Sequence, residues 1–285
     1  MIVACGEWGL RELTVPEHFE FCRRLGFHYL EIGIGGDDAG RLPDRMSEQE
    51  ISEFLALKAQ YDVETPSCVL VNDFTLPNDE CLDREVENVT NALPLVKGLE
   101  AKIARIFAGW MPASEVNEEI WQRMLNGLER CAIVAEKLNL QLALETHGKL
   151  IVDDGVFYHV HTVSTERSAL KRLLEEMPDS IGICYDPGNM RAVNPEDKTY
   201  GLDIVNDRIV YCHLKDWITK KDGWYQAAPG DSDLDYPGLL AKMAYDGIYV
   251  IEYEPTEDVE DGFKRSLEYL RSIGLDVTFR RSWQK

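Results

Sequence analysis

Eight short apolar runs, separated by stretches with helical periodicity, constrain the fold of this 285-residue chain more than any other feature. Each run is rich in Ile, Val, Leu or Tyr and is typical of a buried strand. Strict alternation of strands and helices favours a parallel sheet, and eight such units predict an α/β fold closed into a (β/α)8 TIM barrel. The runs lie near residues 2–5, 28–33, 63–70, 102–108, 140–146, 181–186, 208–214 and 248–253.

An open doubly wound sheet is the alternative, but it requires a Gly-rich phosphate turn after the first strand. The segment from Cys5 to Gly9 matches that turn only in part. The helical stretches carry their own signals: Ser47 and Glu50 form a capping-box pattern, and Ser114 is expected to cap the long helix of 114–139. No linker rich in Pro, Gly or Ser divides the chain, so we expect one domain over residues 1–285.

The composition of the chain argues against two classes of partner, nucleic acids and membranes. The chain has 30 Lys and Arg against 51 Asp and Glu, and the resulting charge of −21 repels phosphate, so we expect no nucleic-acid partner. The seven Cys include no C-x-x-C pair, which is typical of reduced thiols in the cytosol. No apolar run approaches the ~18 residues of a membrane span, and no signal-peptide pattern is evident. We therefore expect a cytoplasmic protein with no membrane partner.

A carboxylate or an imidazole stands where each of the last four strand-like runs ends: Glu145, Asp186, His213 and Glu252. Taken singly, each has an ordinary interpretation, because a Glu can form a salt bridge, an Asp can cap a turn and a His can lie in the core. In a closed parallel barrel, however, the carboxyl ends of the strands face one mouth, so the four side chains can converge. Three carboxylates and one imidazole suit one divalent cation. This oxygen-rich set fits Mn²⁺ or Mg²⁺ best and is compatible with Co²⁺ or Zn²⁺.

The segments ETHG (145–148), YDPGN (185–189), HLKD (213–216) and VIEYEP (250–255), in this order, resemble the xylose isomerase-like TIM barrel superfamily of sugar isomerases and epimerases. The resemblance implies that the four strand-end residues bind one divalent metal ion and that Glu145 and Glu252 also carry protons. Removing a proton next to a carbonyl leaves an enediolate, which a nearby divalent cation stabilises. A carboxylate on each side can remove and return that proton. The implied activity is a metal-dependent isomerase or epimerase acting on a sugar, keto-sugar or keto-polyol.

Other functions remain open within this resemblance. The same machinery can expel a β-leaving group, as a dehydratase or lyase acting on an inosose, a 3-keto-sugar or dehydroshikimate would. A non-catalytic sugar-binding barrel would keep the fold and lose the metal shell, which is intact here. A DNA endonuclease of the endonuclease IV type would need a histidine where Asn189 stands and further histidines on the third and fourth strand segments, which have none. Ketohexose 3-epimerases differ at Asn189 and also at Thr219, where they have arginine. By family analogy, a homo-oligomer is expected.

Three further residues are predicted to bind substrate: His147, Asn189 and Lys215. Alternation along a strand places Lys215 on the same side as His213, where an ammonium group can stabilise an oxyanion. A salt bridge between Lys215 and Asp216 is the alternative, as are a loop position for His147 and a turn-forming role for Asn189.

Two long stretches, 147–163 and 216–235, follow proposed ligand strands and are polar, aromatic and punctuated by Gly. Loops of this length at a barrel mouth are often functional. Among the other polar residues, Glu31 is interpreted as structural, and His159 as a loop histidine that binds no metal.

Overall fold

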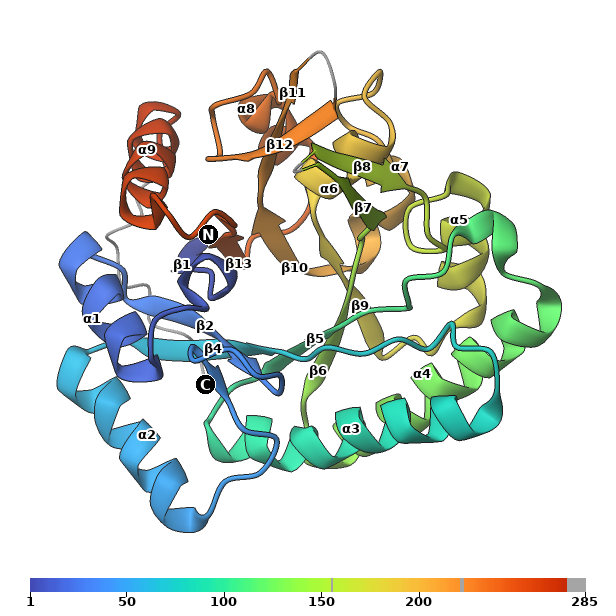
Figure 1. The fold of residues 1–285 in the computed structure, drawn as a ribbon, viewed down its shortest axis with the longest axis horizontal. Helices are drawn as coiled ribbons and strands as arrows, with labels where there is room; N and C mark the ends of the chain where they lie inside the picture. The colour runs from blue at the N-terminus through green and yellow to red at the C-terminus, as the bar shows by residue number, and fades with distance from the viewer. Residues whose placement is uncertain (155, 221–222, 276–285) are drawn as a thin grey trace.

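The computed structural model describes residues 1–154, 156–220 and 223–275, and it confirms the predicted TIM barrel. Its main sheet has nine strands, of which the two-residue β3 (Arg41–Leu42) is an appendage and the other eight close into a parallel barrel. Closure is made by the pairing of β1 with β2 (Figure 1). In their order around the barrel, the eight strands are β1 (Ile2–Cys5), β13 (Ile248–Ile251), β10 (Ile209–Leu214), β9 (Ile181–Tyr185), β6 (Gln141–Glu145), β5 (Ile103–Ile106), β4 (Glu64–Val69) and β2 (Tyr29–Ile34).

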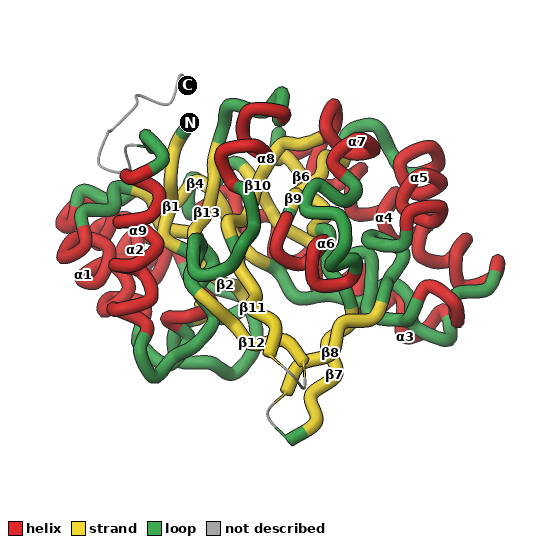
Figure 2. Tube along the Cα trace, turned by 90° about the horizontal axis from the view of Figure 1, so that it is seen from above, coloured by secondary structure: helices red, strands yellow, loops and turns green. Residues whose placement is uncertain are grey.

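Helices connect these strands and pack around the barrel (Figure 2). Within the described residues, none of them combines the length and apolar character that a membrane crossing requires. They are α1 (Val15–Leu25), α2 (Glu48–Tyr61), α3 (Asp79–Gly98), α4 (Glu118–Leu138), α5 (Arg167–Glu176), α6 (Pro187–Val193), α7 (Leu202–Val205), α8 (Tyr236–Lys242) and α9 (Val259–Ser272), with short 3-10 turns η1 (Trp8–Leu10), η2 (Ala113–Glu115) and η3 (Asn206–Arg208).

The two helix caps predicted from the sequence have different outcomes. Ser47 caps α2 as expected, since its hydroxyl accepts from Glu50 N and the Glu50 side chain accepts from Ser47 N. Ser114 does not cap the long helix: it lies in η2, and α4 begins four residues later. The Asn117 side chain accepts a hydrogen bond from Ile120 N at 2.9 Å and is the actual cap. Ser and Asn are comparable caps, so the sequence pattern alone did not separate them.

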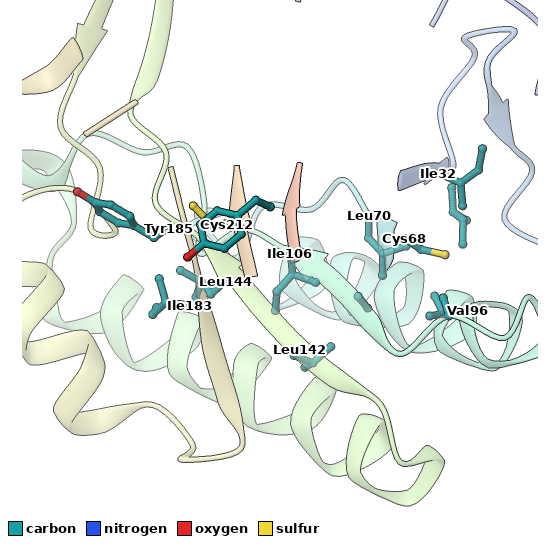
Figure 3. Packing of buried hydrophobic residues seen from close by; sticks show 14 of the residues in the cluster. Ile32, Cys68, Leu70, Val96, Ile106, Leu142, Leu144, Ile183, Tyr185 and Cys212 are labelled. Atoms are coloured by element: carbon teal, nitrogen blue, oxygen red, sulfur yellow. The ribbon is translucent and has the colours of Figure 1, made fainter. Parts of the chain in front are cut away.

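The core has two layers, one inside the barrel and one between the strands and the helices. Small side chains such as Ala4, Ala143 and Cys184 fill the inner layer together with the Tyr29 and Tyr211 rings. The outer layer is larger and combines aliphatic with aromatic side chains, and Figure 3 shows part of it, including Val96, Ile106 and Leu142. Because alternate residues of each strand face the interior and the helices, polar residues on inward-facing positions are directed into the barrel.

A second, four-stranded antiparallel sheet, in the order β11-β12-β8-β7, lies beyond the carboxyl ends of β6 and β10 (Figure 2). Its strands are β7 (Lys149–Asp153), β8 (Val156–Val160), β11 (Asp216–Lys220) and β12 (Gly223–Ala227). The two stretches predicted to be long loops are therefore largely hairpins, although residues 155, 221 and 222 of those stretches lie outside the described residues. One face of this sheet carries Trp217 and Trp224, which pack with Ala192 of α6.

Candidate metal centre

The four strand-end side chains meet in one buried cluster. Glu145 is the last residue of β6, Asp186 directly follows β9, His213 is the penultimate residue of β10, and Glu252 directly follows β13. These four strands are neighbours in the barrel. One ligand atom from each side chain lies within 4.8 Å of those of the other three, and all four residues are buried. The arrangement could hold one metal ion.

Asp186 and Asn189 are linked by a tight turn at the start of α6. The Asp186 carboxylate accepts hydrogen bonds from Asn189 N at 2.8 Å and from Asn189 Nδ2 at 2.9 Å. The same amide nitrogen donates to Glu145 Oε1 at 3.2 Å. Gly188 permits the turn to pack here, since a Cβ atom at that position would lie 2.3 Å from Lys215 O. Asn189 therefore contacts two members of the cluster directly.

The two ring nitrogens of His213 face carboxylates on opposite sides. Nδ1 lies 3.2 Å from Glu252 Oε2 and 3.7 Å from Glu145 Oε1, while Nε2 lies 3.1 Å from Glu31 Oε2. Glu31 also accepts a 2.5 Å hydrogen bond from Tyr211 Oη. Burial favours a neutral imidazole, but the Cys184 thiol and the surrounding carboxylates outweigh it and raise the pKa of His213 well above its ordinary value.

Lys215 contacts the same oxygen of Glu252 as the imidazole does. Its Nζ is 3.2 Å from Glu252 Oε2 and forms a second ion pair with Glu254. The alternative pairing with Asp216 is wrong, because that carboxylate accepts from the backbone N–H groups of Trp217 and residues 230 and 232 instead. Burial disfavours ionised Glu252, yet the cations Lys215 and His213 hold the pKa of Glu252 well below its usual range.

Arg105, on β5, contacts the cluster from the side of Glu145. Its Nε lies 3.0 Å from Glu145 Oε2, and its guanidinium stacks over the Phe107 ring at 4.1 Å. Burial has the largest effect on the Glu145 carboxyl and raises its pKa, although Arg105 and His213 act in the opposite direction. Glu145 Oε2 is buried and has no hydrogen bond within the described part of the chain.

His147 lies near the cluster, but within the described residues no hydrogen bond or ion pair joins it to the four side chains. Its Nδ1 donates to Gly148 O at 2.5 Å, and its ring packs edge-on against Trp110 and Phe107, with centroids 5.0 Å and 5.5 Å away. Burial holds the pKa of His147 well below its usual value, so the ring is neutral at pH 7.

Two aromatic side chains of the antiparallel sheet, Trp217 and His159, cover the cluster, and we call these two residues the aromatic roof. The indole Nε1 of Trp217 donates to Asn189 Oδ1 at 3.4 Å, and its ring lies 5.5 Å from Lys215 Nζ. His159 of β8 packs against the Trp217 ring at 4.5 Å. Both nitrogens of His159 are buried and have no hydrogen-bond partner among the described residues. The residue is thus part of the roof, and not a histidine in an irregular loop as the sequence indicated.

Sequence reasoning missed three contributors: Glu31, Arg105 and the roof residue His159. Glu31 is the third of the six residues of β2, and Arg105 lies in the middle of the apolar run 102–108, which continues past it. The available signal was a charged residue inside an otherwise apolar run, which is costly to bury unless it is paired. His159 gave no such signal, because its segment reads as a polar loop.

Comparison with known proteins places this chain in a family. The family model for the xylose isomerase-like TIM barrel matches residues 19–273. An inosose dehydratase of Geobacillus kaustophilus (strain HTA426) is 24% identical over 172 residues, which cover 53% of this chain and 52% of that protein. An inosose dehydratase of Lacticaseibacillus casei is 20% identical over 185 residues, covering 58% and 57%. The chain thus matches about half the length of these curated relatives.

Solved structures share the fold over nearly the whole chain. A D-tagatose 3-epimerase-like protein has a TM-score of 0.72 and 19% identity, with 96% of this chain and 98% of that chain covered. The IolI protein with a bound zinc atom has a TM-score of 0.73 and 15% identity, with the same coverage. The family model covers most of the sequence, and the chain belongs to the xylose isomerase-like TIM barrel family.

Proposed function

We propose that this protein is a divalent-metal-dependent enzyme that isomerises or epimerises a sugar or keto-sugar by moving a proton on carbon next to a carbonyl group. The observation that carries the proposal is the buried cluster of Glu145, Asp186, His213 and Glu252, whose ligand atoms lie within 4.8 Å of one another. Like charges held this close and away from water are costly unless a cation or a proton lies between them.

The residues present fit one divalent ion. Glu145, Asp186 and Glu252 would supply carboxylate oxygens and His213 would supply Nδ1, since its Nε2 faces Glu31. A carboxylate that holds the other nitrogen of a metal-binding histidine fixes the ring orientation. The donor set suits Mn²⁺ or Mg²⁺, and Zn²⁺ or Co²⁺ is compatible with it; zinc is the metal bound in the IolI structure. When bound, the cation would polarise the substrate carbonyl and stabilise the negative charge that follows proton removal.

Glu145 and Glu252 would carry the proton. Glu145 ends β6 and Glu252 directly follows β13, and β9 and β10 separate these two strands in the barrel, so the two carboxylates approach the cluster from different sides. Their pKa values are pushed apart, that of Glu145 upward by burial and that of Glu252 downward, where Lys215 and His213 outweigh burial. Such a divergence assigns acid and base roles to paired carboxyls. We therefore assign Glu252 as the proton acceptor and Glu145 as the donor.

Three neighbouring side chains would contact the substrate. The buried Lys215 ammonium, which is next to Glu252, can stabilise an oxyanion. Asn189 and His147 line the same region and offer an amide and a neutral imidazole to hydroxyl groups. Trp217 and His159 cover the centre, and their exclusion of water would strengthen each of these polar interactions.

Dehydration of an inosose is the second candidate, because the curated relatives that this sequence matches are inosose dehydratases. It would begin with the same proton removal by Glu252. The electron pair then expels the hydroxyl on the β-carbon, and protonation of that hydroxyl by an acid such as Glu145 releases water. The two candidates therefore share the first step and differ in the fate of the enediolate.

Incubation with ketoses, inososes and 3-keto-glycosides in deuterated water containing Mn²⁺ tests the shared step. We expect deuterium at the carbon next to the carbonyl of at least one substrate, detected by NMR. A product that differs from the substrate only by deuterium in place of hydrogen, with no loss of water, indicates isomerisation or epimerisation, whereas loss of water with new enone absorbance indicates dehydration. Glu252→Gln and Glu145→Gln should each reduce exchange by about 10²-fold or more, with unchanged circular dichroism. Undiminished exchange in both variants would contradict the assignment.

A further inference from the structure

The outer edge of β7 is the least protected part of the antiparallel sheet. In the sheet order β11-β12-β8-β7, β7 pairs with β8 on one side, and no strand of the described residues pairs with its other side. An open edge presents backbone N–H and C=O groups to any strand of suitable sequence. Natural edges are usually blocked by a central Lys, a Pro or a bulge. The centre of β7 is instead Leu150, Ile151 and Val152, with an uninterrupted register to β8.

The same hairpin carries an unusual share of exposed apolar side chains. Val152 is 60% exposed, Ile151 45% and Tyr158 43%, and in the described part of the chain only Val71 and Ile133 are other large apolar residues of this kind. Ile151 and Tyr158 are direct cross-strand partners, so they share one face of the sheet. The hairpin extends away from the barrel in Figure 2, which leaves this edge accessible to another molecule.

We propose that β7 pairs in antiparallel orientation with β7 of a second copy of this chain, about a two-fold axis that passes between the two Ile151 residues. The sequence of β7 is Lys-Leu-Ile-Val-Asp, from residue 149 to residue 153. With Ile151 opposite itself, Lys149 of each copy faces Asp153 of the other, and Leu150 faces Val152. Every opposed pair is thus either apolar or oppositely charged.

This charge pattern indicates that the strand pairing with β7 comes from a second copy of the chain. The chain as a whole carries a charge of −21, which opposes contact between most parts of two identical surfaces. The five residues of β7 contain one positive and one negative charge, so the paired strands add no net charge. Self-complementarity about a two-fold axis is the property that an isologous interface requires.

Pairing would join two four-stranded sheets into one continuous sheet that includes His159 of both copies, because β8 carries His159 and is the neighbour of β7 in the sheet. The contact uses five residues per copy, which places it among small, transient interfaces. We therefore expect a dimer that dissociates on dilution, with a dissociation constant on the order of micromolar.

Sedimentation velocity of the full chain between about 1 and 200 μM tests this proposal. We expect the mass to rise with concentration from 32.5 kDa toward twice that value. Lys149→Asp and Asp153→Lys each create like-charged pairs, and each should raise the dissociation constant about tenfold or more. An equimolar mixture of the two variants should dimerise, because every charged pair between them is again attractive. The variant with both changes should also recover the wild-type behaviour.

Lys171→Asp on α5 is the matched control, because it makes the same change in net charge on an exposed helix surface and should leave the dimer intact. Circular dichroism reports whether each variant is folded, and rescue in the mixture rules out misfolding as the cause. A wild-type chain that stays monomeric throughout would overturn the proposal. So would a dimer that both single charge variants leave unchanged.

Discussion

Replacing Asp186 by Asn tests the candidate metal centre through stability, because the change removes one charge and keeps a capping oxygen. The Asp186 carboxylate caps α6 by accepting from Asn189 N at 2.8 Å, and an Asn side chain can make the same hydrogen bond. The charge is a cost in the metal-free protein. Burial, together with Glu252 and Glu145, raises the pKa of Asp186 well above its ordinary range, even though Lys215 opposes the shift.

The size of the effect follows from the distances in the cluster. Ligand atoms lie within 4.8 Å of one another, so two ionised carboxylates repel by about 3.5 kcal/mol at an effective dielectric constant of about 20. Lys215 and His213 offset part of this repulsion. We expect Asp186→Asn to raise the free energy of unfolding of the metal-free protein by about 1–3 kcal/mol. The melting temperature should rise by roughly 2–4 °C for each kcal/mol.

A divalent cation should reverse the order of stability of the two proteins, so that the wild type becomes more stable than Asp186→Asn. A ligand that binds only the folded state stabilises it by about 2.7 kcal/mol at 100 times its dissociation constant. The wild-type protein should gain this stabilisation with Mn²⁺, and Asp186→Asn should lose most of it. Thermal unfolding followed by circular dichroism, in EDTA and in excess Mn²⁺, measures both effects.

Asp216→Asn is the control for this comparison. Asp216 is also buried and accepts backbone hydrogen bonds, including one from Trp217 N at 3.0 Å, but it lies outside the cluster. Its variant should keep the wild-type response to Mn²⁺. An Asp186→Asn protein that is less stable than wild type in EDTA, or that retains the full Mn²⁺ response, would refute the reasoning.

Glu31→Gln should weaken Mn²⁺ binding by about 10–100-fold in isothermal titration calorimetry, because Glu31 holds Nε2 of His213 at 3.1 Å; equal affinity would show that Glu31 does not orient the ring. Arg105→Met should lower the free energy of unfolding in EDTA by about 3–5 kcal/mol, measured with urea, since it leaves buried Glu145 without its cation. A change below about 1 kcal/mol would contradict that ion pair. Burial lowers the pKa of His18 to about 4, so on acidification the unfolded chain binds a proton at this residue before the folded protein does. The free energy of unfolding should therefore fall as the pH drops from about 6.5 toward 4, by up to about 3 kcal/mol from this residue. Urea unfolding of His18→Gln should lack this component, and an identical pH dependence in both proteins would argue against it.

The barrel could be predicted because its signals are local and repeated. Each strand is a short apolar run and each helix has its own periodicity, so errors at one boundary, such as the cap at Ser114, do not change the topology. The approach of Glu145, Asp186, His213 and Glu252 could also be anticipated, since closing a parallel barrel brings strand ends together regardless of side-chain detail.

The partners of the cluster depend on tertiary contacts that no local pattern contains. Glu31 reaches His213 across the barrel interior, and Arg105 reaches Glu145 from the neighbouring strand. The sheet above them was not predicted because its two stretches were interpreted as loops, whereas the structure pairs them as hairpins and buries Trp217 and the ring nitrogens of His159. Lys215 was expected on the same side as His213, with Asp216 as the alternative partner, and the structure pairs it with Glu252 and Glu254.

A crystal structure of the protein with Mn²⁺, examined by anomalous diffraction at the manganese edge, tests the metal centre most directly. We expect one anomalous peak per chain, coordinated by Glu145, Asp186, His213 Nδ1 and Glu252, with Glu31 still hydrogen-bonded to His213 Nε2. A map with no peak at this cluster under saturating Mn²⁺, or with the only peak elsewhere on the chain, would contradict it.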